Sequence, residues 1–282
     1  VPAIGGVLQR QPRQAGRDRN TRVTAQRRDQ IHARVYQAVG HAVGELVQEH
    51  GHEVDVLNWH DIQRTPEVIE ATLRALKPDV VGFSILHANR WGGIDIARLA
   101  KRLNPATTVV FGGVGATHLW EHLLTHFPEI DYIVRGEGEH TFLNLVRCLA
   151  AGDIGAIGTL PGLALRTDGR PVKTADPEPI CDLDALPKPA RYFDLQHLSL
   201  TRGCVGDCAF CGSPAFWGRR VRSHSAHYFV EQLALLRGWH WLDRVERAQV
   251  ADAVPCTLAG NALSLAAMRA TFGEVMTDAA FV

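Results

Sequence analysis

The stretch DVVGFSIL, residues 79–86, carries the clearest indication of the fold in this chain of 282 residues. Its nearly continuous apolar run is typical of a strand that is covered on both faces. Residues 107–113 (TTVVFGG) share this character, and residues 53–59 and 130–135 add two shorter strand patterns. Apolar spacing predicts helices over residues 31–50, 66–76, 94–103, 119–127 and 140–151. Strands that alternate with such helices predict an α/β fold, a doubly wound parallel sheet with helices on both faces.

Glycines follow three of the predicted strands, at the edge of the sheet where the carboxyl ends of the strands meet. Ligands of such sheets bind outside these ends, and a glycine lets a ligand approach the backbone. The alternative is that each glycine only allows a tight turn after its strand. For a single loop we favour the turn, but three glycine loops at one edge bring the two interpretations near to even. The glycines are Gly92, Gly93, Gly112, Gly113, Gly115, Gly136 and Gly138.

The composition excludes several classes of function. The chain is 46% hydrophobic and 21% charged, as in an ordinary packed protein, and its 30 Lys and Arg balance 30 Asp and Glu. This neutrality removes the electrostatic basis for general nucleic-acid binding. No run of about 18 apolar residues predicts a membrane span, and no signal peptide is visible. We therefore expect a cytoplasmic protein whose cysteines are reduced.

Changes in composition divide the chain into four parts. Residues 1–30, rich in Arg and Gln, are expected to be a disordered arm, and the alternative is a basic arm for an acidic partner. Residues 31–151 hold the alternating strands and helices. Residues 152–195 contain a hairpin pattern around an Asp-Gly turn and then a proline-rich connector. Residues 196–282 are expected to form a second domain.

Three of the six cysteines, Cys204, Cys208 and Cys211, lie within eight residues in the spacing C-x3-C-x2-C. Glycines between and beside them would let the loop curl so that three thiolates face one point. Three soft ligands suit an iron–sulfur cluster or zinc. A closed zinc site needs a fourth ligand, for which only His224 and His227 are close in the sequence. We favour the cluster, which would keep one metal position open; zinc and unrelated thiols remain as alternatives.

The region around these cysteines resembles the cluster loop of radical S-adenosylmethionine (SAM) enzymes. The residues that carry this resemblance are Thr201-Arg202-Gly203-Cys204, Cys208, Phe210-Cys211 and Phe216-Trp217-Gly218. Residues 31–150 resemble the cobalamin-binding domain that is often fused to these enzymes, and residues 183–191 (LDALPKPAR) resemble the segment before the cluster loop. The matching pieces of the upstream domain are GHEV (51–54), VGFS (81–84), GG (112–113) and RGEGE (135–139).

The resemblance implies a function. A [4Fe–4S] cluster on Cys204, Cys208 and Cys211 would bind SAM and cleave it to a 5′-deoxyadenosyl radical, with an electron from a donor such as flavodoxin or ferredoxin. Cobalamin in the upstream domain would carry a methyl group to a small-molecule substrate. Phe210 is expected near the adenine of SAM, and Arg202 either near the cluster or on the surface. The residues implied for cobalamin are Ser84, Gly112, Gly113, Gly136, Glu137 and Gly138.

Some features depart from the family pattern. The D-x-H-x-x-G pattern that supplies an axial histidine is absent, and no first strand is recognised before residue 31. The chain after Cys211 is shorter than the roughly 180–200 residues of a partial βα barrel, scaled from a full barrel. We therefore expect residues 196–282 to be a truncated radical SAM domain that begins a TIM-like barrel. The alternatives to a radical SAM methyltransferase are a non-catalytic corrinoid- or nucleotide-binding module with a vestigial cluster loop, and an inactive gene fragment.

Two other groups of residues have a simpler explanation than a functional site. His118, His122 and His126 recur every four residues, which would suit a metal, but we favour the solvent-facing side of an amphipathic helix. Glu137 and Glu139 could contact a ligand, or could stabilise the start of the following helix through its dipole.

Overall fold

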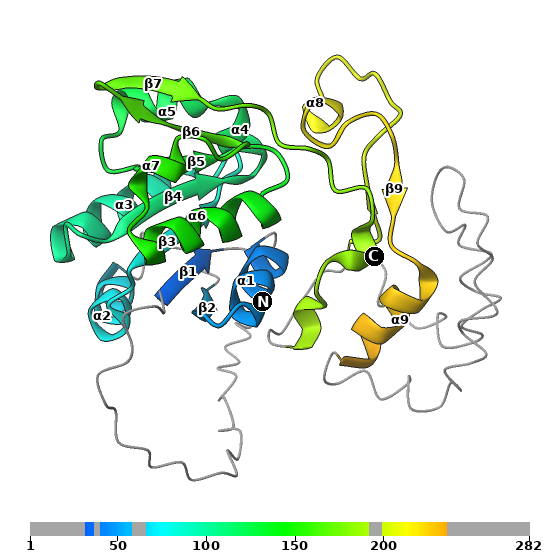
Figure 1. Ribbon diagram of the computed structural model, residues 1–282, viewed down its shortest axis with the longest axis horizontal. Helices are drawn as coiled ribbons and strands as arrows, with labels where there is room; N and C mark the ends of the chain where they lie inside the picture. The colour runs from blue at the N-terminus through cyan, green and yellow to red at the C-terminus, as the bar shows by residue number, and fades with distance from the viewer. Residues whose placement is uncertain (1–31, 37–39, 58–65, 192–198, 236–282) are drawn as a thin grey trace, which may run out of the picture.

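The computed structural model describes residues 32–36, 40–57, 66–191 and 199–235 (Figure 1). The predicted arm, residues 1–30, and residues 236–282 lie outside the described residues. Most of the described chain forms one seven-stranded sheet flanked by helices. Its strands are β1 (His32–Tyr36), β2 (Glu53–Leu57), β3 (Val80–Ser84), β4 (Thr108–Gly112), β5 (Tyr132–Val134), β6 (Leu163–Thr167) and β7 (Arg170–Lys173). Its helices are α1 (Gly40–Glu49), α2 (Pro66–Leu76), α3 (Arg90–Leu103), α4 (Gly113–His118), α5 (Trp120–His126), α6 (Glu139–Ala151) and α7 (Ile154–Ile157).

The strand order is β2-β1-β3-β4-β5-β6-β7. The five strands from β2 to β5 are parallel, and β6 and β7 continue the sheet as antiparallel strands. The order of the parallel strands, 2-1-3-4-5, is that of a doubly wound fold whose direction of winding reverses between β1 and β3. The predicted fold class is therefore confirmed.

The prediction of one helix over residues 31–50 is wrong at its start. Residues His32–Tyr36 form β1, and α1 begins at Gly40. β1 pairs with β2 on one side and β3 on the other, so that Val35 is opposite both Val56 and Gly82. The hydrogen bonds that this segment makes to strands on both sides stabilise it more than the helical spacing of its apolar residues would, because a local preference for helix is weak. The first strand of the fold, which we did not recognise in the sequence, is this segment.

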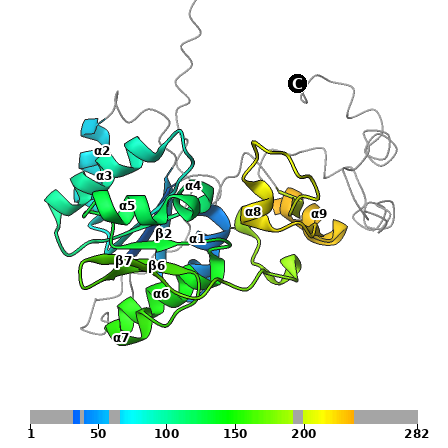
Figure 2. The same cartoon turned by 90° about the horizontal axis from the view of Figure 1, so that it is seen from above.

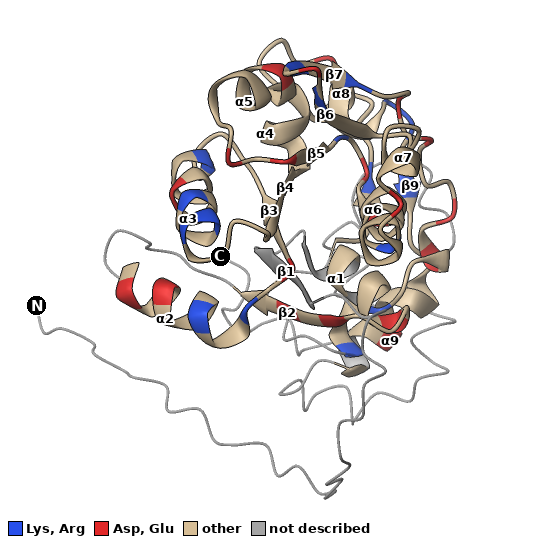
Figure 3. Cartoon of the chain, turned by 60° about the vertical axis from the view of Figure 1, so that its left-hand side comes forward, with Lys and Arg blue, Asp and Glu red and all other residues tan. Residues whose placement is uncertain are grey.

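Different helices cover the two faces of the sheet (Figure 3). Helices α2, α3 and α5 pack on one face, against side chains that include Val81, Val109 and Phe111. Helices α1, α6 and α7 pack on the other face, against Val80 and Val110 among others. Because successive side chains of a strand point to opposite faces, β3 and β4 need apolar side chains throughout. This double covering is the reason for the continuous apolar runs from which the fold was predicted.

The predicted hairpin at residues 163–173 is present, and it forms the edge of the sheet instead of a part of the connector. β5 pairs with β6, and β6 pairs with β7 across the Asp-Gly turn. Arg166 holds this edge in place by donating hydrogen bonds to the carbonyls of Leu124 (2.8 Å), Phe127 (2.7 Å) and Ile130 (2.7 Å). The sheet therefore continues beyond residue 151, where the upstream domain was expected to end.

A second unit follows the proline-rich segment. It comprises the short 3-10 helices η1 (Leu183–Ala185) and η2 (Pro189–Arg191), the strands β8 (Thr201–Arg202) and β9 (Arg222–Ser223), and the helices α8 (Ser213–Trp217) and α9 (Ala226–Leu235). β8 and β9 pair antiparallel, and α8 lies beside α4 of the sheet unit (Figure 2). None of the helices described in either unit has the length and hydropathy needed to cross a bilayer.

Candidate functional site

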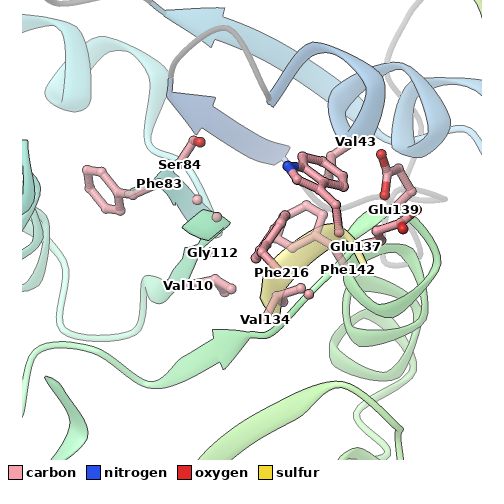
Figure 4. Close-up of a pocket in the computed structure, with 15 residues that line it drawn as sticks. Val43, Phe83, Ser84, Val110, Gly112, Val134, Glu137, Glu139, Phe142 and Phe216 are labelled. Carbon is pink, nitrogen blue, oxygen red and sulfur yellow. The ribbon is translucent and has the colours of Figure 1, made fainter. Parts of the chain in front are cut away.

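A pocket lies at the carboxyl edge of the sheet, where the ends of β3, β4 and β5 meet (Figure 4). Parallel strands end at one edge, so the loops that follow them converge there. The structure brings together around this pocket the six residues that the resemblance implied for cobalamin, whereas Gly92 and Gly93 lie in α3, Gly115 lies in α4, and none of these three lines the pocket. Ser84 ends β3, Gly112 and Gly113 join β4 to α4, and Gly136, Glu137 and Gly138 join β5 to α6. Their contact with a cofactor stays a prediction.

Different features of the structure explain the two glycines at the end of β4 and the start of α4. Gly113 has φ +85°, and a Cβ there would lie 3.1 Å from the carbonyl oxygen of Ile85, so the backbone itself requires glycine. Gly112 has extended φ, and a Cβ there would make only ordinary van der Waals contacts, with Val134 from 3.5 Å and with the carbonyl oxygen of Phe83 at 3.9 Å. The turn interpretation therefore explains Gly113. At Gly112 neither the backbone nor the packing requires a glycine, whose small size leaves the pocket open.

The walls of the pocket are mostly apolar. On the sheet side they come from Val110, Val134 and Phe142, and across the pocket from Phe216 and Trp217 of α8 (Figure 4). The second unit therefore supplies one wall of a pocket that the first unit begins. Among the described residues, the lining includes no histidine. A planar, largely apolar ligand with polar edges is the kind of group that suits such walls.

Two glutamates at the rim of the pocket are bound by two arginines of the second unit. Arg202 donates from one nitrogen to Glu137 Oε2 (3.0 Å) and from another to Glu139 Oε1 (2.6 Å). Arg222 forms an ion pair with Glu137 Oε1. All four side chains are at most 12% exposed, so these charges are compensated almost entirely by one another. We call these four residues the ion-pair network.

The ion-pair network also holds the aromatic wall. The guanidinium of Arg202 lies 5.2 Å from the centre of the Trp217 ring, and Arg222 donates to the carbonyl of Trp217 (2.9 Å). Burial lowers the pKa of Arg202, but Glu139 and Glu137 raise it by more, so the pKa lies above the usual value for arginine. Arg202 is therefore a buried permanent cation, so the surface position considered for it is wrong, and its position near a cluster stays a prediction.

One oxygen of the ion-pair network has no partner in the described residues. Glu139 Oε2 is buried and accepts no hydrogen bond, although the other oxygen of this carboxylate is bound by Arg202. A buried acceptor without a donor is unfavourable by about 1–3 kcal/mol. Since Glu139 also lines the pocket, a ligand with amide donors, as cobalamin has at its periphery, fits this position.

The three cysteines lie on residues 203–221, which we call the cysteine loop, between β8 and β9. The loop is closed at its base by a hydrogen bond from the Cys204 N–H to the carbonyl of Gly218 (3.1 Å). Gly203 has φ +102°, and a Cβ there would lie 2.1 Å from the carbonyl oxygen of Arg220. Cys208 and Cys211 are exposed, whereas Cys204 is half-buried.

The cysteine loop leaves space for a metal centre beside its sulfurs. The Gly206 N–H donates to Cys204 Sγ (3.4 Å), and a Cβ on Gly206 would lie 3.4 Å from Cys204 Sγ and 3.7 Å from Cys208 Sγ. The missing side chain thus leaves space beside two of the sulfurs. Within the described ranges, no three His, Cys, Asp or Glu side chains converge on one ion position.

Neither histidine considered as a fourth zinc ligand points to the cysteines. His224 Nδ1 lies 3.2 Å from Asp184 Oδ1, and its ring stacks on Tyr228 with centroids 4.1 Å apart. Burial lowers the pKa of His224, and Asp184 opposes this effect only in part. His227 is exposed and lies 3.7 Å from Glu231.

The histidines at positions 118, 122 and 126 are all exposed, as expected for the solvent-facing side of an amphipathic helix. The three histidines do not share one helix, because His118 ends α4, while His122 and His126 belong to α5, the helix predicted over residues 119–127. His118 contributes to the contact between the two units, since a Cβ on Gly212 would lie 3.4 Å from its Nε2.

Phe210, expected near the adenine of SAM, is 94% exposed and lies outside the pocket lining. Its role stays a prediction. Phe216, Trp217 and Arg222 are site residues that were not predicted, and Glu139 had been considered both as a ligand contact and as a residue that stabilises the start of a helix. A signal existed for Phe216 and Trp217, which belong to the resemblance around the cysteines. None existed for Arg222, because its partner Glu137 is distant in the sequence.

Comparison with known proteins supports the same interpretation of the sheet unit. Residues 36–146 match the family model of the B12 binding domain. This match covers the strands and loops that form the sheet side of the pocket. The resemblance of the upstream region to a cobalamin-binding domain is confirmed by this match.

Relatives of known sequence extend the match beyond the B12-binding domain. The chain is 28% identical over 218 residues to an uncharacterised methyltransferase of Pyrococcus horikoshii, with 72% of this chain and 46% of the relative covered. It is 30% identical over 186 residues to the anaerobic magnesium-protoporphyrin IX monomethyl ester cyclase of Rubrivivax gelatinosus, covering 61% and 33%. It is also 30% identical over 205 residues to the hopanoid C-3 methylase of Methylococcus capsulatus, covering 69% and 39%. The chain spans less than half the length of each.

Solved structures share the fold across both units. The radical SAM methyltransferase TsrM from Kitasatospora setae, solved with tryptophan and a SAM analogue, aligns with a TM-score of 0.59 at 18% identity, covering 73% of this chain and 44% of TsrM. The cobalamin-dependent SAM radical enzyme OxsB, solved with aqua-cobalamin and SAM, aligns with a TM-score of 0.58 at 17% identity, covering 74% and 32%. At this identity the likeness is one of fold.

Proposed function

We propose that this chain acts as a cobalamin-dependent radical SAM enzyme, with methyl transfer to a small molecule as its reaction class. One observation carries the proposal. The pocket of the B12-binding domain and the cysteine loop are neighbours, since α8 of the cysteine loop forms a wall of that pocket through Phe216 and Trp217. A methyl carrier and a radical source must be close together, and this contact would bring their two sites together.

Each site has residues suited to its cofactor. Cys204, Cys208 and Cys211 would hold a [4Fe–4S] cluster with one iron left open to SAM, and Phe210 would pack near the adenine. When bound, these cofactors supply the electron that cleaves SAM and the carrier of the methyl group. The residues proposed to contact cobalamin are Ser84, Gly112, Gly113, Gly136, Glu137 and Gly138.

The remaining pocket residues would control access and orientation. Val110, Val134 and Phe142 would exclude water from the buried face of the ligand, and Phe216 and Trp217 would do so from the other side. The Ser84 hydroxyl would donate or accept a hydrogen bond at the polar edge of the ligand. Among the described lining residues, the titratable side chains are those of Glu137 and Glu139, which belong to the ion-pair network, so no proton transfer is assigned to them.

Three broader features belong to the same proposal. We place the boundary between the two functional domains in the segment 152–195, after the sheet edge. The exposed Cys208 and Cys211 would let an electron donor such as flavodoxin or ferredoxin approach the cluster. Reduced thiols and an oxygen-sensitive cluster both favour work in the cytoplasm.

Anaerobic reconstitution with iron and sulfide tests the proposal. We expect brown protein with visible charge-transfer absorbance, close to four irons per chain as in a [4Fe–4S] centre, and cleavage of SAM when reductant is added. Cys208→Ala should lose the colour, whereas Cys181→Ala, which changes an exposed thiol outside the cysteine loop, should keep it. Aquacobalamin should bind the same preparation.

The alternatives give different results in this experiment. Stoichiometric zinc in place of iron would support a zinc-stabilised interaction protein. Cobalamin binding without SAM cleavage would support a non-catalytic corrinoid-binding module. Absence of iron from oxygen-protected protein would refute the enzymatic proposal.

A further inference from the structure

The ion-pair network lies at the two ends of the cysteine loop. Arg202 is in β8, directly before the loop, and Arg222 is in β9, directly after it. Both arginines bind the same carboxylate, that of Glu137, through its two different oxygens. The two ends of the cysteine loop are therefore fixed to a single side chain at the rim of the pocket.

The carboxylates are as firmly placed as the arginines. Glu137 lies on the short turn between β5 and α6, and Glu139 is the first residue of α6. The turn itself is held by a hydrogen bond from the Gly136 N–H to Thr117 Oγ1 (3.0 Å). Because both oxygens of Glu137 are bound by arginines, its carboxylate joins the two units, and the residue also lines the pocket.

Because the four charged side chains are buried, each one depends on its partners in the ion-pair network. Two carboxylates and two guanidinium groups balance in charge, and removing one leaves an uncompensated charge away from water. The planar guanidinium of Arg202 meets Glu137 and Glu139 with different nitrogens, which fixes its orientation as well as its distance. Movement of the cysteine loop relative to the pocket would break these contacts together.

We propose that Glu137 and Glu139 are positioning residues that fix the distance between the three cysteines and the pocket of the B12-binding domain. This inference rests on the proposed function for its consequence. If that function holds, the contact keeps a constant distance between a metal centre on the cysteines and a corrinoid in the pocket. The contact itself is independent of any cofactor. Its removal should free the cysteine loop without unfolding the sheet unit.

Glu137→Gln in the full chain tests the inference, because it removes the charge and keeps the shape. In protein without cofactors, amide hydrogen exchange should become at least about ten-fold faster at the N–H groups of Cys204 and His224, whose hydrogen bonds hold the loop. Exchange at the Ile85 and Gly115 amides, which are bonded within the sheet unit, should not change.

A second readout uses the loaded protein. In wild type holding both cofactors, the paramagnetic Co(II) form of cobalamin and the reduced cluster should broaden each other's electron paramagnetic resonance signals. In Glu137→Gln at saturating cofactor, each signal should persist and the broadening should be lost. A change in fold stability alone would not remove the coupling from molecules that hold both centres.

Glu129→Gln is the matched control. Glu129 also pairs with an arginine, Arg98 (3.0 Å), and also has one buried oxygen without a partner, but it lies in the sheet unit away from the cysteine loop. It should leave both readouts at wild-type values. Wild-type exchange at Cys204 and His224 in Glu137→Gln would overturn the inference, whether or not cofactors bind. Failure of wild type to take up iron or cobalamin would instead refute the proposed function, and the exchange experiment would still decide on the contact.

Discussion

Gly203 is the residue at which the cysteine loop is most sensitive to one added carbon. Its φ of +102° is unfavourable for any L-residue, and a Cβ would lie 2.1 Å from the carbonyl oxygen of Arg220. We expect Gly203→Ala to force β8 and β9 apart at the base of the loop. Most of the iron taken up in anaerobic reconstitution should be lost, as measured by metal analysis.

Gly218→Ala is a control that introduces backbone strain without a steric clash. Gly218 also has positive φ (+79°), but nothing lies within 4 Å of a Cβ there. The substitution should reduce the free energy of unfolding by only about 1–2 kcal/mol and leave iron uptake intact. Equal iron uptake by the two variants would show that the close approach to Arg220 does not constrain the loop.

A different cysteine tests the electrostatics of the sheet unit. Burial raises the pKa of the Cys148 thiol, and Asp153 raises it further, so little thiolate is present at neutral pH. We expect iodoacetamide to label Cys148 several-fold more slowly than the exposed Cys181, as measured by peptide mass spectrometry. Faster labelling of Cys148 would mean that α6 opens readily at this position.

At the scale of elements, Arg166 joins the hairpin of β6 and β7 to the end of α5. Its guanidinium satisfies three backbone carbonyls, those of Leu124, Phe127 and Ile130. Arg166→Met would leave these acceptors without their donor, at about 1–3 kcal/mol for each one that stays away from water. We expect a fall of about 2–4 kcal/mol in the free energy of unfolding in urea, with no change in the cysteine loop. Arg170→Met, an exposed change on the same hairpin, should have little effect.

The contact between the connector and α9 should depend on pH through His224. Because its pKa in the folded state is lowered from 6.5, the unfolded chain binds the proton more tightly. Its contribution to stability is therefore present above pH 6.5 and lost as the pH falls through the lower folded pKa. Hydrogen exchange of α9 should show protection that falls on acidification. His224→Gln, which can still donate to Asp184, should remove that dependence, and an unchanged pH profile would contradict the assignment to His224.

Helices and strands could be predicted from the sequence where the local residue pattern favours the same structure as the packing in the fold. Pro66–Leu76 forms a helix with the predicted bounds, since a proline starts it and its apolar side chains face the sheet. β1 was missed because the valine spacing of residues 31–50 suits a helix, while its strand is defined by two neighbours that lie far along the chain. The helix α4 was also missed, because its glycine-rich sequence GVGATH has low helix propensity and is held by packing against β3.

For the whole molecule, the sequence could predict the sheet, the loops that end at one edge, and the three cysteines, because each depends on residues that are close in the chain. It could not predict that these two sites meet. Their meeting depends on Arg202 and Arg222 binding Glu137 and Glu139, and no periodicity or motif spacing encodes such a pairing. The RGEGE motif indicated a functional loop, and the partners of its glutamates became visible only in three dimensions.

A pocket built by both units should lose ligand affinity when only the second unit is changed. Trp217 lines the pocket from α8, and its indole supplies apolar surface that no neighbouring residue would replace. Trp217→Ala should weaken aquacobalamin binding about ten-fold, equivalent to about 1.4 kcal/mol, as measured by equilibrium dialysis. Trp91→Ala is the matched control, because Trp91 is 55% exposed on α3 and does not line the pocket. Equal affinities of wild type and both variants would mean that cobalamin does not contact the wall formed by α8. The two cofactors would then not meet at this edge of the sheet.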